Sequence, residues 1–133
     1  MGSLRSLLRS SLVLLMMCTE AQAGQGGLAS WYSSKECCKP NKPCLMANGE
    51  DLRDAEREEA KTGRHFVASW HYPLGTYVRV CRADDPKRCV RAEVKDRGPS
   101  KRLKQRVVDL GVESFNELED PKKGLVAVTV TEI

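Results

Sequence analysis

The chain has 133 residues and a formal net charge of +4, with 41% hydrophobic and 30% charged residues. This length suits one domain with a modest core and leaves no room for two. A charge this small lies in the ordinary range of soluble domains, although it also suits an anionic polymer or membrane surface. No nucleic-acid-binding motif is present, so we predict no nucleic-acid partner.

Residues 1–23, MGSLRSLLRSSLVLLMMCTEAQA, have the pattern of a secretory signal peptide. Two arginines precede an apolar run, and Ala21-Gln22-Ala23 resembles a small-residue cleavage site. The run is too short to span a bilayer as a mature helix. We therefore expect residues 24–133 to be exported to the periplasm, cell envelope or extracellular space. A retained membrane anchor is the alternative.

Cys18 lies in a context that approaches the lipidation motif of bacterial lipoproteins. Met17 is bulky where that motif has a small residue, so we expect no lipid anchor at Cys18. The charged residues of the leader, Arg5, Arg9 and Glu20, account for +1 of the net charge of +4. The mature domain therefore keeps a mild charge of +3.

The mature chain contains an odd number of cysteines for an oxidising compartment: Cys37, Cys38, Cys44, Cys81 and Cys89. Two disulfides and one leftover thiol are the simplest arrangement. The spacing of the first three does not suit zinc, and no histidine lies near them in the sequence, so we predict no metal centre. Their pairing stays open.

In chain order, residues 28–32 form the first strand candidate, after a short flexible start. The Cys/Pro/Lys-rich residues 33–43 are expected to be a loop. Residues 51–62 (DLRDAEREEAKT) are dense in charge and contain good helix formers, which predicts a solvated helix or surface insertion outside the core.

Residues 76–82 and 89–94 both alternate with period two, and residues 82–88 between them are expected to form a turn, so the whole reads as a hairpin. If Cys81 faces Cys89, a cross-strand disulfide becomes plausible. The same register pairs Val80 with Val90, Val78 with Ala92, and Arg79 with Arg91. The arginine pair is unfavourable unless a carboxylate lies nearby.

The C-terminal third of the chain continues this pattern. Residues 106–110 are a further short strand, residues 113–118 a helical turn, and residues 125–133 the clearest strand, with Val126, Val128 and Val130 on one face. About six short strands with little helix favour a small β-barrel or sandwich.

The segment VKDRGPS, residues 94–100, places a carboxylate between two cations at the end of a strand. Alternation puts Asp96 in phase with Ala92 and Val94, on the buried side, while Lys95 and Arg97 point away. Gly-Pro then ends the strand, which would hold the carboxyl half-shielded at a rim that substrate can reach. The alternative is that Asp96 accepts backbone hydrogen bonds from its own turn.

Five short motifs follow one another along the chain: GLASWY (27–32), ANGE (47–50), PLGTYVRV (73–80), DRGP (96–99) and RVVDLG (106–111). In this order they resemble the rare lipoprotein A (RlpA-like) family of double-psi β-barrels, which is related to the expansin barrels. The resemblance covers nearly the whole mature chain. It implies an all-β fold over residues 24–133, a six-stranded double-psi β-barrel with short helical insertions.

The resemblance also implies lytic transglycosylase action on peptidoglycan, without a cofactor. The residue that matches the catalytic position is Asp96. Its carboxyl would protonate the glycosidic oxygen and then accept the proton of the sugar's own C6 hydroxyl as an anhydro ring closes. Hydrolytic glycosidases usually divide such work between two carboxyls. Asp109 matches a second acidic position that resembles the important aspartate of expansins; a buried structural carboxylate is the alternative.

The chain departs from the family pattern near these carboxylates. Ser69 occupies the position of a histidine in the lytic members, and His71 lies two residues nearer the proline. Lys95 replaces the usual Asn, and Gly111 the usual Ser. Catalysis by the exported protein is therefore one hypothesis. A non-catalytic, expansin-like wall-binding or wall-loosening module is the second, and a small disulfide-rich effector or inhibitor the third.

Aromatic side chains offer apolar faces on which sugar rings can stack. We expect Trp70, His71, Tyr72 and Arg97 to bind substrate, either peptidoglycan or another cell-wall polysaccharide. Core packing is the default expectation for Trp31. Nothing in the sequence calls for an obligate protein partner.

Overall fold

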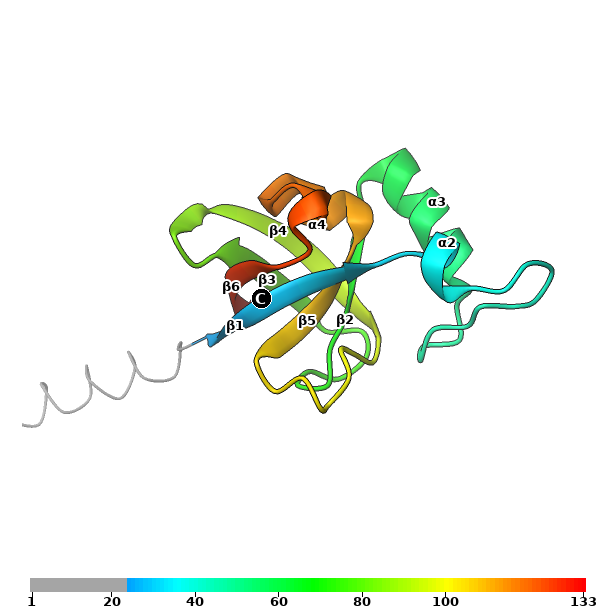
Figure 1. Ribbon diagram of the computed structural model, residues 1–133, viewed down its shortest axis with the longest axis horizontal. Helices are drawn as coiled ribbons and strands as arrows, with labels where there is room; N and C mark the ends of the chain where they lie inside the picture. The colour runs from blue at the N-terminus through cyan, green and yellow to red at the C-terminus, as the bar shows by residue number, and fades with distance from the viewer. Residues whose placement is uncertain (1–23) are drawn as a thin grey trace, which may run out of the picture.

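The computed structural model describes residues 24–133, so the predicted signal peptide and Cys18 lie outside the described residues. Six strands close into a barrel in the order β1-β5-β2-β4-β3-β6 (Figure 1). Two neighbouring pairs are parallel, β1 with β5 and β2 with β4. The strands are β1 (Gln25–Tyr32), β2 (His65–Ala68), β3 (Tyr77–Arg82), β4 (Asp85–Asp96), β5 (Arg106–Gly111) and β6 (Val126–Glu132). The predicted all-β, six-stranded double-psi barrel with short helical insertions is confirmed.

Small apolar side chains fill the barrel because each strand alternates between its interior and its outer face. On β6 the predicted face is confirmed: Val126, Val128 and Val130 are buried, and the residues between them are not. α4 (Val112–Leu118) packs against this core through Phe115 and Leu118, which are completely buried. The barrel thus supplies a rigid frame for the loops at its ends.

The hairpin register is confirmed in full, since Cys81 pairs with Cys89, Val80 with Val90, Val78 with Ala92 and Arg79 with Arg91. The guanidinium of Arg91 lies over the ring of Tyr77, 4.8 Å from its centroid, and the Tyr77 hydroxyl donates to Glu93. These contacts offset the unfavourable arginine pair. The predicted turn over residues 82–88 is too long, because β4 already begins at Asp85 and a register shift beside Arg82 absorbs the extra residues.

The described residues contain two disulfides, Cys38–Cys44 and Cys81–Cys89, and one exposed free thiol, Cys37. The prediction of two bridges and one leftover cysteine is confirmed, and the structure assigns the pairing in the first cluster. Within residues 24–133, no helix has the length and apolar character needed to cross a membrane.

The charged segment forms α3 (Leu52–Thr62), as expected. Asp51 caps its first turn by accepting a hydrogen bond from the Arg53 N–H, and Gly63 ends it in the left-handed conformation, with φ of 73°. The expectation that this segment lies outside the core is wrong for one face. Leu52 and Ala55 pack with Met46 and Phe66 into a second apolar cluster. α3 lies beside the barrel with the one-turn helix α2 (Ser34–Cys37) (Figure 1).

The start of the first strand differs from the prediction. β1 begins at Gln25, because the expected flexible start pairs with β6. β2 ends at Ala68, and the chain then bends through residues 69–72. The Ser69 hydroxyl accepts a hydrogen bond from the His71 N–H at 3.0 Å, a local bond that competes with sheet pairing.

Candidate functional site

The two predicted carboxylates meet at one end of the barrel through strand pairing. Asp96 on β4 and Asp109 on β5 are both register partners of Ala68 on the short strand β2. Asp109 is also paired with Ser30 on β1. Since neighbouring strands lie about 4.8 Å apart, four residues from four strands form one lateral row. Two carboxylates from strands that do not pair with each other therefore lie in one row at the same end of the barrel.

Asp96 is half-buried and held by backbone donors. Its Oδ1 accepts hydrogen bonds from the N–H of Ala47 at 3.0 Å and of Arg97 at 2.8 Å. The alternative that Asp96 accepts hydrogen bonds from its own turn therefore holds for the Arg97 N–H. The second donor, the Ala47 N–H, belongs to the distant ANGE motif. Among the described residues, no cation lies within ion-pair distance of Asp96. The carboxylate is neither fully exposed nor neutralised by a guanidinium.

Asp109 lies in a different environment from Asp96. The Ser30 hydroxyl donates a hydrogen bond to its Oδ1. Burial raises the pKa of the Asp109 carboxyl; the Ser30 hydrogen bond and the positive charge of Arg106 offset part of this rise, and the negative charge of Asp96 adds to it. Asp109 therefore keeps its proton to a higher pH than an ordinary aspartate.

Gly98 lies in close packing beside this carboxyl. A Cβ at this position would lie 3.1 Å from the Asp109 Oδ2 and 3.3 Å from the Ala68 Cβ. The DRGP motif therefore contributes more than Asp96, because its glycine lets the following loop pass directly against the second carboxylate.

Tyr32 completes the site and was missed in the sequence. Burial and the negative charges of Asp96 and Asp109 raise the pKa of the Tyr32 hydroxyl, so it stays neutral, and it donates to the Met46 sulfur at 3.8 Å. The signal was available in GLASWY, where alternation separates Ser30 and Tyr32 from Trp31. The Trp31 indole donates to the Pro121 carbonyl at 2.9 Å, which agrees with its expected packing role.

The residues predicted to bind substrate lie in different environments. The Trp70 side chain is half exposed, and its indole N–H donates to the Pro99 carbonyl at 2.8 Å. His71 is exposed and meets Tyr72 edge-on, with 4.8 Å between ring centroids. Tyr72 packs against the core and donates to the Val130 carbonyl. The Arg97 guanidinium donates to two carbonyls of the 69–72 bend. Trp70 and His71 are thus open to a ligand, while Tyr72 and Arg97 support them.

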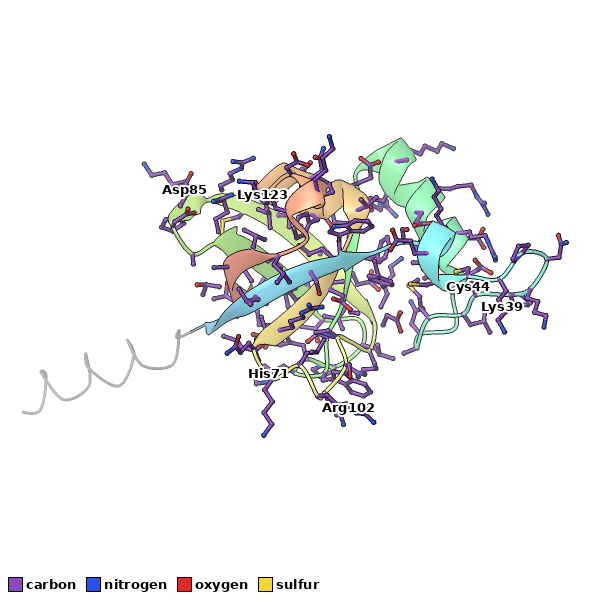
Figure 2. All side chains as sticks on the ribbon, in the orientation of Figure 1. Lys39, Cys44, His71, Asp85, Arg102 and Lys123 are labelled. Atoms are coloured by element: carbon purple, nitrogen blue, oxygen red, sulfur yellow. A yellow bond between two sulfur atoms is a disulfide. The ribbon has the colours of Figure 1, made fainter. Side chains whose placement is uncertain are left out.

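A hollow of about 250 Å³ lies beside Trp70. Its walls include Trp70, His71, Gly98, Lys101 and Lys104. Figure 2 shows His71 and Arg102 at the same end of the molecule. The walls of the hollow include neither Asp96 nor Asp109, but Gly98 separates the hollow from Asp109, since a Cβ at Gly98 would lie 3.1 Å from the Asp109 Oδ2.

A larger hollow, of about 1110 Å³, lies between α3 and β4 and includes neither Asp96 nor Asp109 in its walls. At one side of it, His65 Nδ1 lies 2.8 Å from Glu59 Oε2, and its Nε2 lies 3.3 Å from Glu117 Oε2. The hydrogen bond with Glu59 and the two negative charges raise the pKa of His65 despite its burial. This cluster links α3, β2 and α4, so its role is to stabilise the fold.

No protein-family model and no curated protein matches the sequence. Among solved structures, the ligand-free expansin of Clavibacter michiganensis is similar, with 21% identity and a TM-score of 0.56 over 81% of this chain and 49% of the expansin. A mutant of that expansin in complex with cellohexaose gives 19% identity and a TM-score of 0.55, with the same coverage. The chain has the barrel fold of an expansin.

A Streptomyces papain inhibitor is also similar, with 21% identity and a TM-score of 0.55 over 84% of this chain and 96% of the inhibitor. The chain therefore spans about half the length of the expansin and nearly all of the inhibitor. At these identities the similarities show the fold alone. The narrower resemblance to the rare lipoprotein A family stays a prediction.

Proposed function

We propose that the protein is an exported module that binds a cell-wall polysaccharide without cleaving it. The observation that carries the proposal is Trp70, a half-exposed ring whose indole N–H is anchored on the Pro99 carbonyl. An aromatic ring held in this way matches the apolar C–H face of a pyranose. The expansin fold supports the proposal, since one expansin structure is a complex with cellohexaose.

The position of Ser69 favours binding over catalysis. The residue that replaces the family's histidine is buried, and its hydroxyl accepts the His71 N–H. Its own N–H donates to the Asp96 carbonyl at 2.9 Å, so it lies directly beside the carboxylate without offering an imidazole. His71 is exposed, two residues further along. The two disulfides fit an exported protein, because such bridges persist in oxidising compartments.

Pull-down of the mature domain by insoluble peptidoglycan and by cellulose tests this proposal. We expect retention on at least one polymer, weakened by Trp70→Ala, with no new chain ends in the polymer. Tyr77→Ala is a matched control, because Tyr77 is an exposed aromatic on the outer face of β3, in the wall of the larger hollow. Equal retention of the two variants would argue against Trp70 as the ring on which the sugar stacks.

Lytic cleavage is the second candidate, favoured by the paired carboxylates. The raised pKa of Asp109 suits it to donate a proton to a glycosidic oxygen, while Asp96, for which the family resemblance implies both roles, would accept the proton of the C6 hydroxyl. Incubation with peptide-free glycan strands should then yield anhydro-sugar ends. The yield should fall in both Asp96→Asn and Asp109→Asn. If the wild-type protein yields no anhydro-sugar ends, lytic cleavage is ruled out and only the binding function remains.

Failure to bind any polymer would favour the third hypothesis, a scaffold for inhibition. The full-length match in size to the papain inhibitor makes papain the first protease to test in that case. Inhibition of papain without polysaccharide binding would replace the proposal above.

A further inference from the structure

We propose that the loop between β4 and β5 makes this protein select acidic polysaccharides over neutral ones, an inference that rests on the proposed binding function. Residues 97–105, called here the basic loop, read RGPSKRLKQ, with four cations and no carboxylate. Figure 1 shows the loop at the end of the barrel opposite α4. One short segment thus concentrates positive charge beside the candidate sugar platform.

The charges at the tip of the basic loop are not neutralised within the protein. Lys101, Arg102 and Lys104 are exposed, and in the part of the chain that the structure describes none lies within 4.0 Å of a carboxylate oxygen. Several other surface cations are paired, such as Arg82 with Glu119 and Lys95 with Glu50. Uncompensated cations on one edge create a local potential that attracts anions.

The basic loop and Trp70 share the hollow of about 250 Å³. The Lys101 ammonium lies 4.3 Å from the centroid of the Trp70 ring, and Lys104 lines the same hollow. A pyranose that contacts the exposed part of the ring would therefore bring its substituents close to two ammonium groups. A carboxylate or phosphate on that sugar would form ion pairs with Lys101 and Lys104, whereas a neutral glucan offers these ammonium groups no negative charge.

Asp109 restricts how an acidic chain can lie. It lies behind Gly98, since a Cβ at that position would come within 3.1 Å of its Oδ2, and its ionised form repels an anionic substituent. Gly98, Lys101 and Lys104 line the hollow, whose walls include neither Asp96 nor Asp109. The anionic group of a bound sugar is therefore expected to face Lys101 and Lys104, away from Gly98.

Binding titrations with polygalacturonate and with neutral cellohexaose test the inference. We expect wild type to bind polygalacturonate at least tenfold more tightly. The double variant Lys101→Gln/Lys104→Gln should lose roughly tenfold for polygalacturonate, about threefold per exposed charge contact, and little for cellohexaose. Raising sodium chloride from about 0.1 M to about 1 M shortens the screening length from about 10 Å to about 3 Å and should remove the preference.

The matched control is Lys122→Gln/Lys123→Gln, which removes the same charge from exposed positions. Figure 2 shows Lys123 at the opposite end of the molecule from Arg102. Equal affinity of wild type for the two ligands, or equal losses in the two double variants, would overturn the inference while the proposed function stands. Binding to neither ligand nor to insoluble peptidoglycan or cellulose would overturn both.

Poly(glycerol phosphate) teichoic acid separates the glycan from a simple polyanion, because its backbone has anions but no pyranose ring. We expect it to bind more weakly than polygalacturonate and to be insensitive to Trp70→Ala, whereas polygalacturonate should lose affinity in that variant. Binding of the teichoic acid as tight as that of polygalacturonate, with Trp70→Ala affecting neither, would overturn the assignment to an acidic glycan. Circular dichroism should confirm that all variants fold.

Discussion

The Cys81–Cys89 bridge should contribute a large part of the stability of the barrel. Its two cysteines are separated by 8 residues in the sequence and are register partners across the β3–β4 hairpin. For a loop of this size, the chain-entropy model gives about 2.5 kcal/mol of stabilisation at room temperature. Domains of this size have a total stability of about 5–15 kcal/mol, so the bridge would account for a sixth to a half of it.

The change is Cys81→Ala/Cys89→Ala, and the control is Cys37→Ala, which removes an exposed thiol with no bridge. Urea unfolding followed by circular dichroism should show a free energy of unfolding lower by about 2–3 kcal/mol in the double variant. The melting temperature should fall by roughly 10 °C. The control should lie within about 0.5 kcal/mol of wild type, as is usual for a surface substitution.

A double variant that unfolds with the same free energy as the control would refute this reasoning. The hairpin would then be held by its valine pairs and by its pairing with β6, and loop closure in the unfolded chain would contribute nothing measurable. A loss near the expected value would mean that a reducing compartment weakens the barrel, which gives the predicted export a thermodynamic reason.

Three further predictions concern the site and its frame. Gly98→Ala should lower the free energy of unfolding by roughly 1–3 kcal/mol in urea titrations, because the new Cβ crowds Asp109; an unchanged value would show that the loop relaxes freely. Asp109→Asn should be at least as stable as wild type near neutral pH, because burial raises the carboxyl pKa; the gap should close as the pH falls toward about 4, and a gap that widens in acid would contradict this. The raised pKa of His65 beside Glu59 means that its stabilising charge is fully present below about pH 6.5 and is lost as the pH rises through the folded-state pKa. Stability measured against pH should show this loss in wild type and in His71→Gln but not in His65→Gln, and the same slope in all three would contradict the assignment.

Local patterns in the sequence predicted the parts of the fold that local physics determines. The β3–β4 register followed from alternation and two cysteines, and the buried face of β6 followed from its valines. β2 was missed because four residues, HFVA, carry too short a pattern. The inner face of α3 was missed because Leu52 and Ala55 are few among many charges, and they become core only by packing with Met46 and with Phe66 on β2.

In the candidate site too, the sequence predicted individual residues but not the contacts between distant segments. Asp96 and Asp109 were singled out by their motifs, but their meeting depends on β2 lying between β4 and β5. No local signal connects Ala47 to Asp96, since the hydrogen bond joins residues 49 positions apart. Tyr32 was overlooked for a related reason, because only the fold brings its hydroxyl near the two carboxylates.

The Arg97 guanidinium holds two loops together through its two hydrogen bonds. It donates to the Ser69 carbonyl at 2.8 Å and to the Tyr72 carbonyl at 2.6 Å, and so fastens the bend that carries Trp70 to the first residue of the basic loop. The aromatic ring and the lysines are thereby tethered before any ligand arrives. Less conformational freedom is then lost on association, which raises affinity without adding a contact.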